Sequence, residues 1–116
     1  MMLVLSKPPS VNHLYGHNKW GGLYLKPQAI VWIKESLYKI KFLSKVNTTY
    51  DTPVKVDIEF YTTMSSDLDN ILKLTLDLLA KHAQIIKNDN LVMEMHLRKI
   101  KTKKVDQKLV INIEPL

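Results

Sequence analysis

The sequence predicts an α/β fold, with a single domain over residues 1–116, the element order β-α-β-α-β-β, a mixed sheet and two main helices. Three observations predict it. Apolar and polar residues alternate over 54–61, which is the period of a half-buried strand. Apolar residues recur every three or four positions over 27–44 and 68–82, which is typical of helices with one buried face. At 116 residues and 46% hydrophobic, the chain is long enough for one core and too short for two.

The amino-terminal part of the chain is expected to form a short strand and then a long loop. Leu3 to Leu5 begins the strand, and Pro8 and Pro9 keep the next segment from becoming helical. All three glycines lie in the loop beyond, beside tyrosine, tryptophan and lysine residues. That composition suits contact with a nucleic acid through charge and stacking. Burial of Trp20 and Tyr24 in the core, with the lysines solvated, is the alternative.

Two helices account for the longest periodic segments. The first is expected from Pro27 to about Ser44, because proline is favoured in the first turn of a helix. Its buried stripe is expected to consist of Ile30, Ile33, Leu37 and Ile40. The second helix is expected from about Leu68 to His82. Its inward stripe is expected to consist of Leu68, Ile71, Leu72, Thr75, Leu79 and His82, widened by Leu76 and Leu78.

Three further strands complete the predicted sheet. The first of them covers 54–61 and ends near Thr63, and its pattern is the clearest in the chain. The next begins at Leu91 and runs to Arg98, and the last covers 109–113. A lysine-rich hairpin connection from Lys99 to Lys104 is expected between the last two, so the sheet should be antiparallel at its last pair.

The charge and the lack of cysteine restrict the possible functions. The formal net charge is +6, and Arg98 is the only arginine among 17 lysine and arginine residues. Lysine acts as a point charge against phosphate, which favours recognition of a nucleic-acid backbone over reading of base edges. The absence of cysteine excludes disulfides, thiolate zinc sites and thiol nucleophiles, and it fits the cytoplasm. The apolar start of the chain is too short for a signal peptide or a membrane helix.

Acidic residues gather at one point of this basic chain, where the strand over 54–61 leads into the second helix. Asp67 and Asp69 can face one cation if they adopt an extended or capping conformation, and Lys73 lies on the same helical face as Asp69. Asp89 precedes the next strand, so it should lie at the same end of the sheet as Asp67 if the two strands are neighbours. Three carboxylates leave positions open on Mg²⁺ for water and a phosphate.

Simpler explanations exist for the same residues. Serine and aspartate before a first helical turn act as caps without any metal, and Asp89 is also an ordinary turn residue. A basic nucleic-acid-binding module without catalytic activity is therefore the alternative function. A metal-dependent nuclease for RNA or flapped DNA is a second alternative. The histidines lack the neighbourhood of a catalytic motif; they are His13, His17, His82 and His96.

Three motifs occur in order along nearly the whole chain. They are Pro8-Pro9-Ser10-x-Asn12-x-x-Tyr15, then Asp67-x-Asp69-Asn70-x-x-Lys73-x-x-x-Asp77-x-Leu79, and finally Asn88-Asp89-x-x-Val92. In this order and spacing the chain resembles the RusA family of Holliday junction resolvases. The central motif is the most specific of the three, and the proline-rich opening is an independent match.

The resemblance implies a small homodimeric endonuclease of phage or prophage-bearing bacteria that depends on Mg²⁺, with Mn²⁺ as a substitute. Such an enzyme resolves four-way DNA junctions by paired symmetric cleavage. Asp67, Asp69 and Asp89 would be the metal ligands, and Lys73 would be the catalytic lysine. Asn70 and Asp77 also match family positions. The residues expected to contact DNA are Lys7, Asn12, Tyr15, Lys19 and Lys26.

The chain departs from the family pattern in two places. Family members commonly have two adjacent acids where this chain has Asn88-Asp89, and the match to Asp89 needs a one-residue insertion after the second helix. Some members also carry a run of arginines before the first acid, where this chain has uncharged residues over 62–66. That part of the DNA contact is therefore expected to move to other lysines, for which the candidates are Lys7, Lys19, Lys26 and the segment from Lys99 to Lys104.

Overall fold

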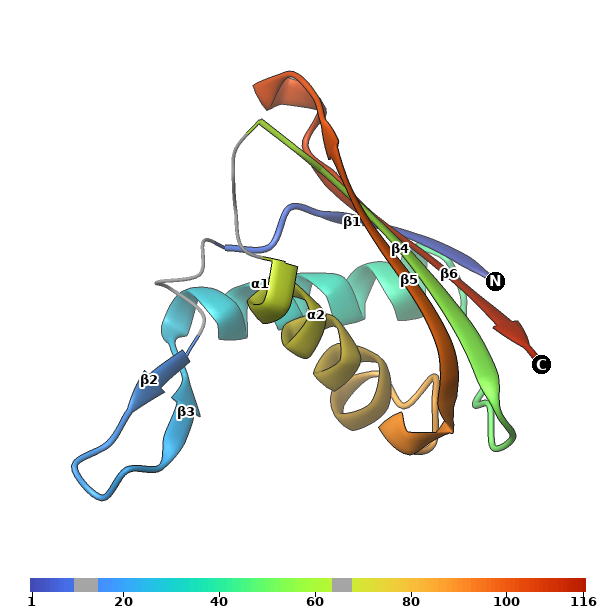
Figure 1. The fold of residues 1–116 in the computed structure, drawn as a ribbon, viewed down its shortest axis with the longest axis horizontal. Coiled ribbons are helices and arrows are strands. Elements are labelled where there is room, and N and C mark those ends of the chain that lie inside the picture. The colour runs from blue at the N-terminus through green and yellow to red at the C-terminus, as the bar shows by residue number, and fades with distance from the viewer. Residues whose placement is uncertain (10–14, 64–67) are drawn as a thin grey trace.

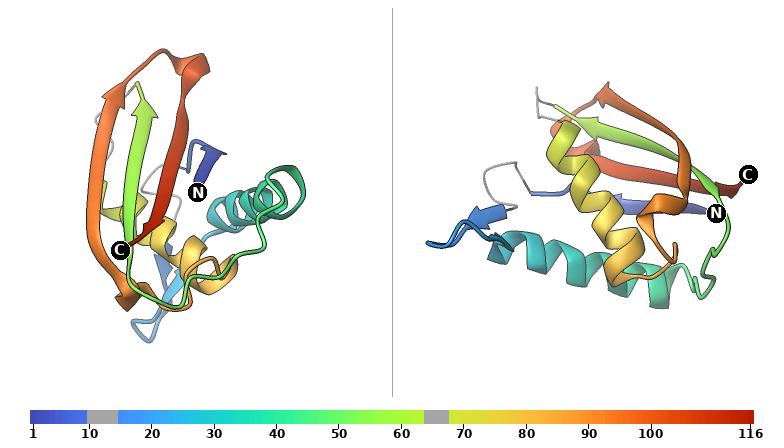
Figure 2. Two further views of the ribbon diagram at one scale, coloured as in Figure 1. Left: turned by 90° about the vertical axis from the view of Figure 1, so that its right-hand side faces the viewer. Right: turned by 60° about the horizontal axis from the view of Figure 1, so that its bottom comes forward.

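The computed structural model describes residues 1–9, 15–63 and 68–116, and it places both main helices on one face of a four-stranded sheet (Figure 1). The other face of the sheet is left uncovered by these helices (Figure 2). The chain is a single α/β domain with a mixed sheet, as predicted. The strands of the main sheet are β1 (Met2–Ser6), β4 (Val54–Thr62), β5 (Val92–Lys101) and β6 (Lys108–Pro115). A separate hairpin consists of β2 (Tyr15–His17) and β3 (Leu23–Leu25).

The strand order in the main sheet is β1-β6-β4-β5. β6 is antiparallel to both of its neighbours, whereas β4 and β5 are parallel. The predicted hairpin between the last two strands is therefore wrong, because β4 lies between β5 and β6. The connection from β5 to β6 passes the end of β4, where the Thr102 amide donates to the Thr62 carbonyl at 3.0 Å. It includes the short 3₁₀ turn η5 (Lys104–Asp106).

The sheet contributes one layer of the core through strict alternation. Val54, Val56, Ile58 and Phe60 of β4 are at most 1% exposed, and Leu109, Ile111 and Ile113 of β6 are fully buried. This confirms the expected period-two pattern of both strands. β5 contains one extra residue opposite the step from Val54 to Lys55 of β4. This residue, Met93, has no partner on β4 and is 67% exposed.

Both helices have the predicted extent, and both end in a wide π-type turn. α1 (Pro27–Tyr38) continues into η2 (Lys39–Leu43), and α2 (Leu68–Asp77) continues into η3 (Leu78–His82). The Ser44 amide donates to the Lys39 carbonyl and the Ala83 amide to the Leu78 carbonyl, both at 2.8 Å. Each of these bonds spans five residues instead of the four of an α-helix.

The buried faces of the helices differ from the predicted stripes by about one position. On the first helix Ile30 is 41% exposed, and the buried residues are Ala29, Trp32, Ile33, Ser36 and Ile40. On the second helix Leu72, Leu76 and His82 are only partly buried. Its fully enclosed residues are Ile71, Leu74, Thr75, Leu78 and Leu79. Trp32 shifts the first stripe because its indole N–H donates to the Ser6 carbonyl of β1 at 2.9 Å.

The hairpin of β2 and β3 projects away from the sheet and helices (Figure 1). Asn18 fixes its turn by accepting bonds from the amides of Trp20 and Gly22, both at 2.9 Å. A Cβ at Gly16 would lie 2.4 Å from the outer end of the Tyr24 ring, so a larger residue there would displace this exposed side chain. Trp20 is 81% exposed and Tyr24 is 49% exposed, so their burial in the core is excluded. No helix in the described part of the chain is long and apolar enough to cross a membrane.

Candidate nuclease site

The candidate acidic residues lie where β4 is joined to α2. Asp67 falls outside the described residues, and of Asp69 and Asn70 the structure describes only the backbone, which is helical. Asp69 is in the first turn of α2, as predicted. Lys73 follows one turn later and is exposed. The expected steps of four from Asp69 to Lys73 and Asp77 therefore fall within the one α-helix.

Asp77 is engaged at the carboxyl end of that helix. Its carboxylate lies 3.6 Å from the Lys81 ammonium, an i,i+4 pair. The Asp77 side chain is 17% exposed and that of Lys81 is 69% exposed. This arrangement is typical of a structural ion pair on a helix surface.

Asp89 lies at the other end of the sheet from the point where β4 ends. It opens the 3₁₀ turn η4 (Asp89–Leu91), where the Asn88 side chain accepts a bond from the Asn90 amide at 3.0 Å. β5 is parallel to β4, with Val92 opposite Val54 and Lys101 opposite Thr62. The expectation that Asp89 lies at the end of the sheet where β4 leads toward the second helix is therefore wrong. Parallel neighbours start at the same end, so the residue before β5 lies near the start of β4.

The helix separates the two acidic positions within one chain. Asp89 lines a shallow hollow of about 310 Å³ with Ala80, Lys81, Lys87 and Asn88, at the carboxyl end of the helix. Ala80 is 11 residues from Asp69 in the sequence, which is about 17 Å along a helix. Figure 2 shows α2 starting near the end of the sheet where β4 ends and running toward η4. One chain alone does not bring Asp89 to Asp69.

Lysines surround the end of the sheet where β4 ends. Five of them are exposed there: Lys99 and Lys101 of β5, Lys103 and Lys104 of the connection, and Lys108 of β6. Lys99 is opposite Phe60, Lys101 is opposite Thr62, and Lys108 is opposite Tyr61. The Lys108 ammonium lies 4.9 Å from the centre of the Tyr61 ring. This end of the sheet is thus a concentrated positive surface suited to phosphates.

A glutamine joins this lysine-bearing connection to the end of β4. Gln107 accepts bonds from the Thr62 hydroxyl at 3.2 Å and from the Thr63 amide at 3.4 Å. Its side-chain amide donates to the Lys104 carbonyl at 3.1 Å. Gln107 therefore holds Thr62 and Thr63, which precede Asp67 and Asp69 in the chain, in a fixed position relative to Lys104. Sequence reasoning missed this residue because nothing in its local pattern distinguishes it from any surface glutamine.

The residues predicted to contact DNA through the amino-terminal loop are dispersed. Lys7 follows β1 and Lys26 precedes α1, and both are half-buried. Lys19 is exposed at the tip of the hairpin, where its ammonium lies 4.5 Å from the Trp20 ring centre. Asn12 and the side chain of Tyr15 lie outside what the structure describes. The hairpin therefore presents a cation and an exposed aromatic ring together, as the sequence suggested.

The chemistry of the candidate ligands suits a hard divalent cation. Asp67 and Asp69 offer carboxylate oxygens, which are the donors that Mg²⁺ takes from proteins. Among the side chains that the structure describes, no group of three or more histidine, cysteine, aspartate or glutamate residues could hold a metal ion. Asp67 and the side chain of Asp69 lie outside what the structure describes.

An α/β domain with acidic residues at a helix start and lysines around the adjacent sheet end has the elements of a phosphodiesterase acting on nucleic acid. The family model described as Endodeoxyribonuclease RusA matches residues 6–114. The chain belongs to this family and is an endodeoxyribonuclease, as the motifs indicated. It is 30% identical over 115 residues to the Crossover junction endodeoxyribonuclease RusA of Aquifex aeolicus (strain VF5). That alignment covers 97% of this chain and 90% of the relative.

Proposed function

We propose that this endodeoxyribonuclease resolves Holliday junctions as a Mg²⁺-dependent homodimer that makes paired symmetric cuts. The observation that carries the proposal is the family match over residues 6–114, in which the acidic start of α2 follows directly on the lysine-rich end of the sheet. The lysines attract the junction backbone, and the acids provide the negative charge that a catalytic cation needs there. Two symmetric cuts require two equivalent sites, which a two-fold dimer supplies.

Each of the proposed site residues has a distinct task. Asp67 and Asp69 hold the cation, which when bound polarises the scissile phosphate and lowers the pKa of water. Lys73, one helical turn beyond Asp69, stabilises the charge that develops on the phosphate oxygens. The exposed lysines at the sheet end hold the neighbouring phosphates in register, and Lys19 and Trp20 of the hairpin contact the backbone and bases of a junction arm.

Asp89 can take part in this chemistry only if two chains combine. The carboxyl half of the helix separates it from Asp69 of its own chain, whereas a symmetric dimer allows Asp89 of one subunit to approach the acids of the other. Asp89 is exposed and therefore accessible to a second chain. We therefore assign each complete site to Asp67, Asp69 and Lys73 of one subunit and Asp89 of its partner.

The first test replaces the cation-binding charge without changing the shape of the side chain. Asp69→Asn should abolish Mg²⁺-dependent nicking of a four-way junction and leave junction binding equal or tighter. Lys73→Ala should behave in the same way, because one lysine among many contributes little to affinity. Asp106→Asn, an exposed acid in η5, is the matched control and should cleave normally. Undiminished cleavage by Asp69→Asn would refute the assignment.

The second test asks whether the site is shared between subunits. Asp69→Asn and Asp89→Asn chains are each inactive alone, but after mixing and refolding a heterodimer has one intact site and one doubly mutated site. Random mixing makes half of the dimers heterodimers, so roughly one quarter of the wild-type sites should return. Nicking should reappear without paired cleavage. If both acids act within one chain, the mixture stays inactive.

A panel of substrates separates this function from its alternatives. Four-way, flapped and linear duplex DNA and structured RNA should be offered with Mg²⁺, with Mn²⁺ and with EDTA. Preferential cleavage of the four-way junction that EDTA abolishes supports the proposal. A binding module without catalytic activity would bind equally well in EDTA and cut none of them.

A further inference from the structure

The outer edge of β5 has no partner in the described part of the chain. β5 is ten residues long, lies at the end of the strand order and is paired only with β4. Figure 2 shows this strand at the margin of the sheet, with no described element beside its outer edge. The opposite edge strand, β1, has five residues and lies next to α1. A long unpaired edge is the preferred template for adding another strand.

We propose that β5 pairs antiparallel with β5 of a second copy, about a two-fold axis at His96, to form one continuous eight-stranded sheet. The inference specifies the homodimer on which the proposed function rests. The occupant is a second copy because the edge is complementary to itself once one strand is reversed. Positions 92–95 carry no lysine or arginine, whereas Arg98, Lys99 and Lys101 gather in the other half. Antiparallel pairing places the half of β5 without basic residues in one copy beside the basic half of β5 in the other copy.

The side-chain directions fix the register. Directly opposite residues of antiparallel strands point to the same face, so the position numbers of each pair must sum to an even number. An axis at His96 places Glu94 opposite Arg98 of the partner subunit. An axis at Leu97 would instead place Glu94 opposite an isoleucine and His96 opposite an arginine. The axis at His96 is the one that gives two symmetric pairs of opposite charge.

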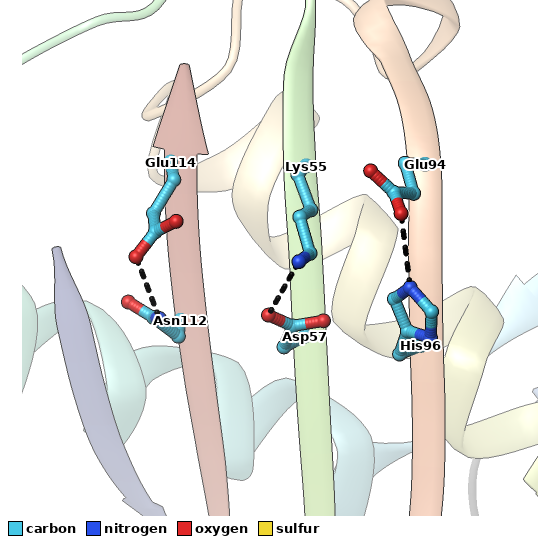
Figure 3. A network of polar contacts seen from close by, with 6 residues as sticks. All are labelled: Lys55, Asp57, Glu94, His96, Asn112 and Glu114. Carbon is cyan, nitrogen blue, oxygen red and sulfur yellow. Dashed lines mark hydrogen bonds and ion pairs between the residues drawn. The ribbon is translucent and has the colours of Figure 1, made fainter. Parts of the chain in front are cut away.

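Charges on the uncovered face continue this pattern across each subunit. Figure 3 shows Glu114, Lys55 and Glu94 side by side on three neighbouring strands. The next row on this face contains Asn112, Asp57 and His96, and the row after it contains Glu59 and Arg98, which form an ion pair. With the axis at His96, the row of Glu114, Lys55 and Glu94 continues into Arg98 of the partner subunit and then into Glu59 of the partner subunit. The signs alternate along the whole row, so each charge has opposite neighbours.

The helix-covered face of β5 is suited to the same contact. Met95 and Leu97 are partly buried and pack against the core from this edge. The axis at His96 places Met95 opposite Leu97 of the partner subunit, and the symmetric pair forms between Leu97 and Met95 of the partner subunit. Two apolar pairs are then covered on this face while two ion pairs form on the other. Both faces of the strand therefore favour the same register.

The same pairing also brings Asp89 of the partner subunit toward the end of the sheet where β4 ends. Reversal of the second strand places the start of β5 of the partner subunit beside the end of β5 that carries Lys99 and Lys101, and Lys101 is itself opposite Thr62 at the end of β4. Asp89 of the partner subunit then lies at the lysine-rich end of the sheet, where the acidic segment of the first chain follows.

The absence of cysteine makes the register directly testable. His96→Cys places two thiols opposite each other on the axis, with Cβ atoms about 5 Å apart, which is close enough for a disulfide after a small adjustment. Mild oxidation should convert most of this variant to a covalent dimer. Glu94→Cys and Arg98→Cys should each stay uncrosslinked alone, because identical positions are then about 13 Å apart. Their mixture should form the crosslinked heterodimer.

Glu114→Cys is the matched control, since it is an exposed residue on the same face of β6 and should not crosslink. The proposal is refuted if the chain sediments as a monomer at the concentrations at which it cleaves. It is also refuted if a dimer forms without the His96→Cys disulfide or with equal crosslinking at Glu114→Cys. Crosslinking needs no cleavage, so a crosslinked dimer that fails to cut junctions would refute the proposed function and leave the interface standing.

Discussion

Replacement of Lys101 by glutamine should flatten the salt dependence of junction binding. Lys101 is exposed, lies opposite Thr62 at the end of β4, and points to the helix-covered side of the sheet by its alternation with Leu97. It therefore lies at the end of the sheet from which the chain continues toward Asp67 and Asp69. If it neutralises a phosphate in each of two subunits, the variant loses two phosphate contacts per dimer.

The size of the effect follows from counterion release. Each contact contributes about 0.9 to the slope of log K against log salt, so the slope should fall by about 1.8. Over a fourfold rise in salt, wild-type affinity should drop roughly 12-fold more than that of the variant. The measurement is junction binding between about 50 and 200 mM salt without divalent cation, so that cleavage cannot occur.

A matched substitution tests whether position matters or only net charge. Lys41→Gln removes the same charge from an exposed residue in η2, away from the lysine-rich end of the sheet. Its slope should equal that of the wild type. Equal slopes for all three proteins would show that Lys101 contacts no phosphate, and the location of the DNA surface would then be wrong.

Two further predictions concern stability and positioning. Leu74→Ala opens a cavity beneath a fully buried position and should lower the free energy of unfolding by about 2 to 5 kcal/mol in denaturant titrations, whereas Leu43→Ala, at a 65% exposed position, should change it by less than about 0.5 kcal/mol. A similar loss for both would contradict the packing of α2. Gln107→Ala removes the bonds to Thr62 and Thr63 and should lower stability by about 1 to 2 kcal/mol. It should slow nicking more than it weakens junction binding, unlike Gln28→Ala on the exposed side of α1; a parallel loss of both would show no positioning role.

Local patterns predicted the elements well because their causes are local. The alternation of β4 and β6 and the extents of both helices follow from the spacing of apolar residues. The motifs around Asp69 and Lys73 identified the family for the same reason. Strand order is set by contacts between distant segments, so the sequence did not reveal that β4 separates β5 from β6.

The predicted position of Asp89 was wrong because β5 runs parallel to β4, although the two strands are neighbours. β4 and β5 are neighbours as supposed, but the condition for a shared end also required them to be antiparallel. Likewise, the one-position shift in the buried face of α1 arose because Trp32 is anchored to β1 through Ser6, a contact that periodicity alone does not contain.

The wide turn at the end of the second helix has a consequence for length variation among relatives. A turn closed by a bond from residue 83 back to residue 78 accommodates one residue more than an α-turn with little added rise. The resemblance to the family implies one extra residue between Lys73 and Asp89. If the wide turn accommodates the extra residue, η4 keeps its position at the end of the helix. Relatives of different length can then place the equivalent aspartate at the same position in the fold.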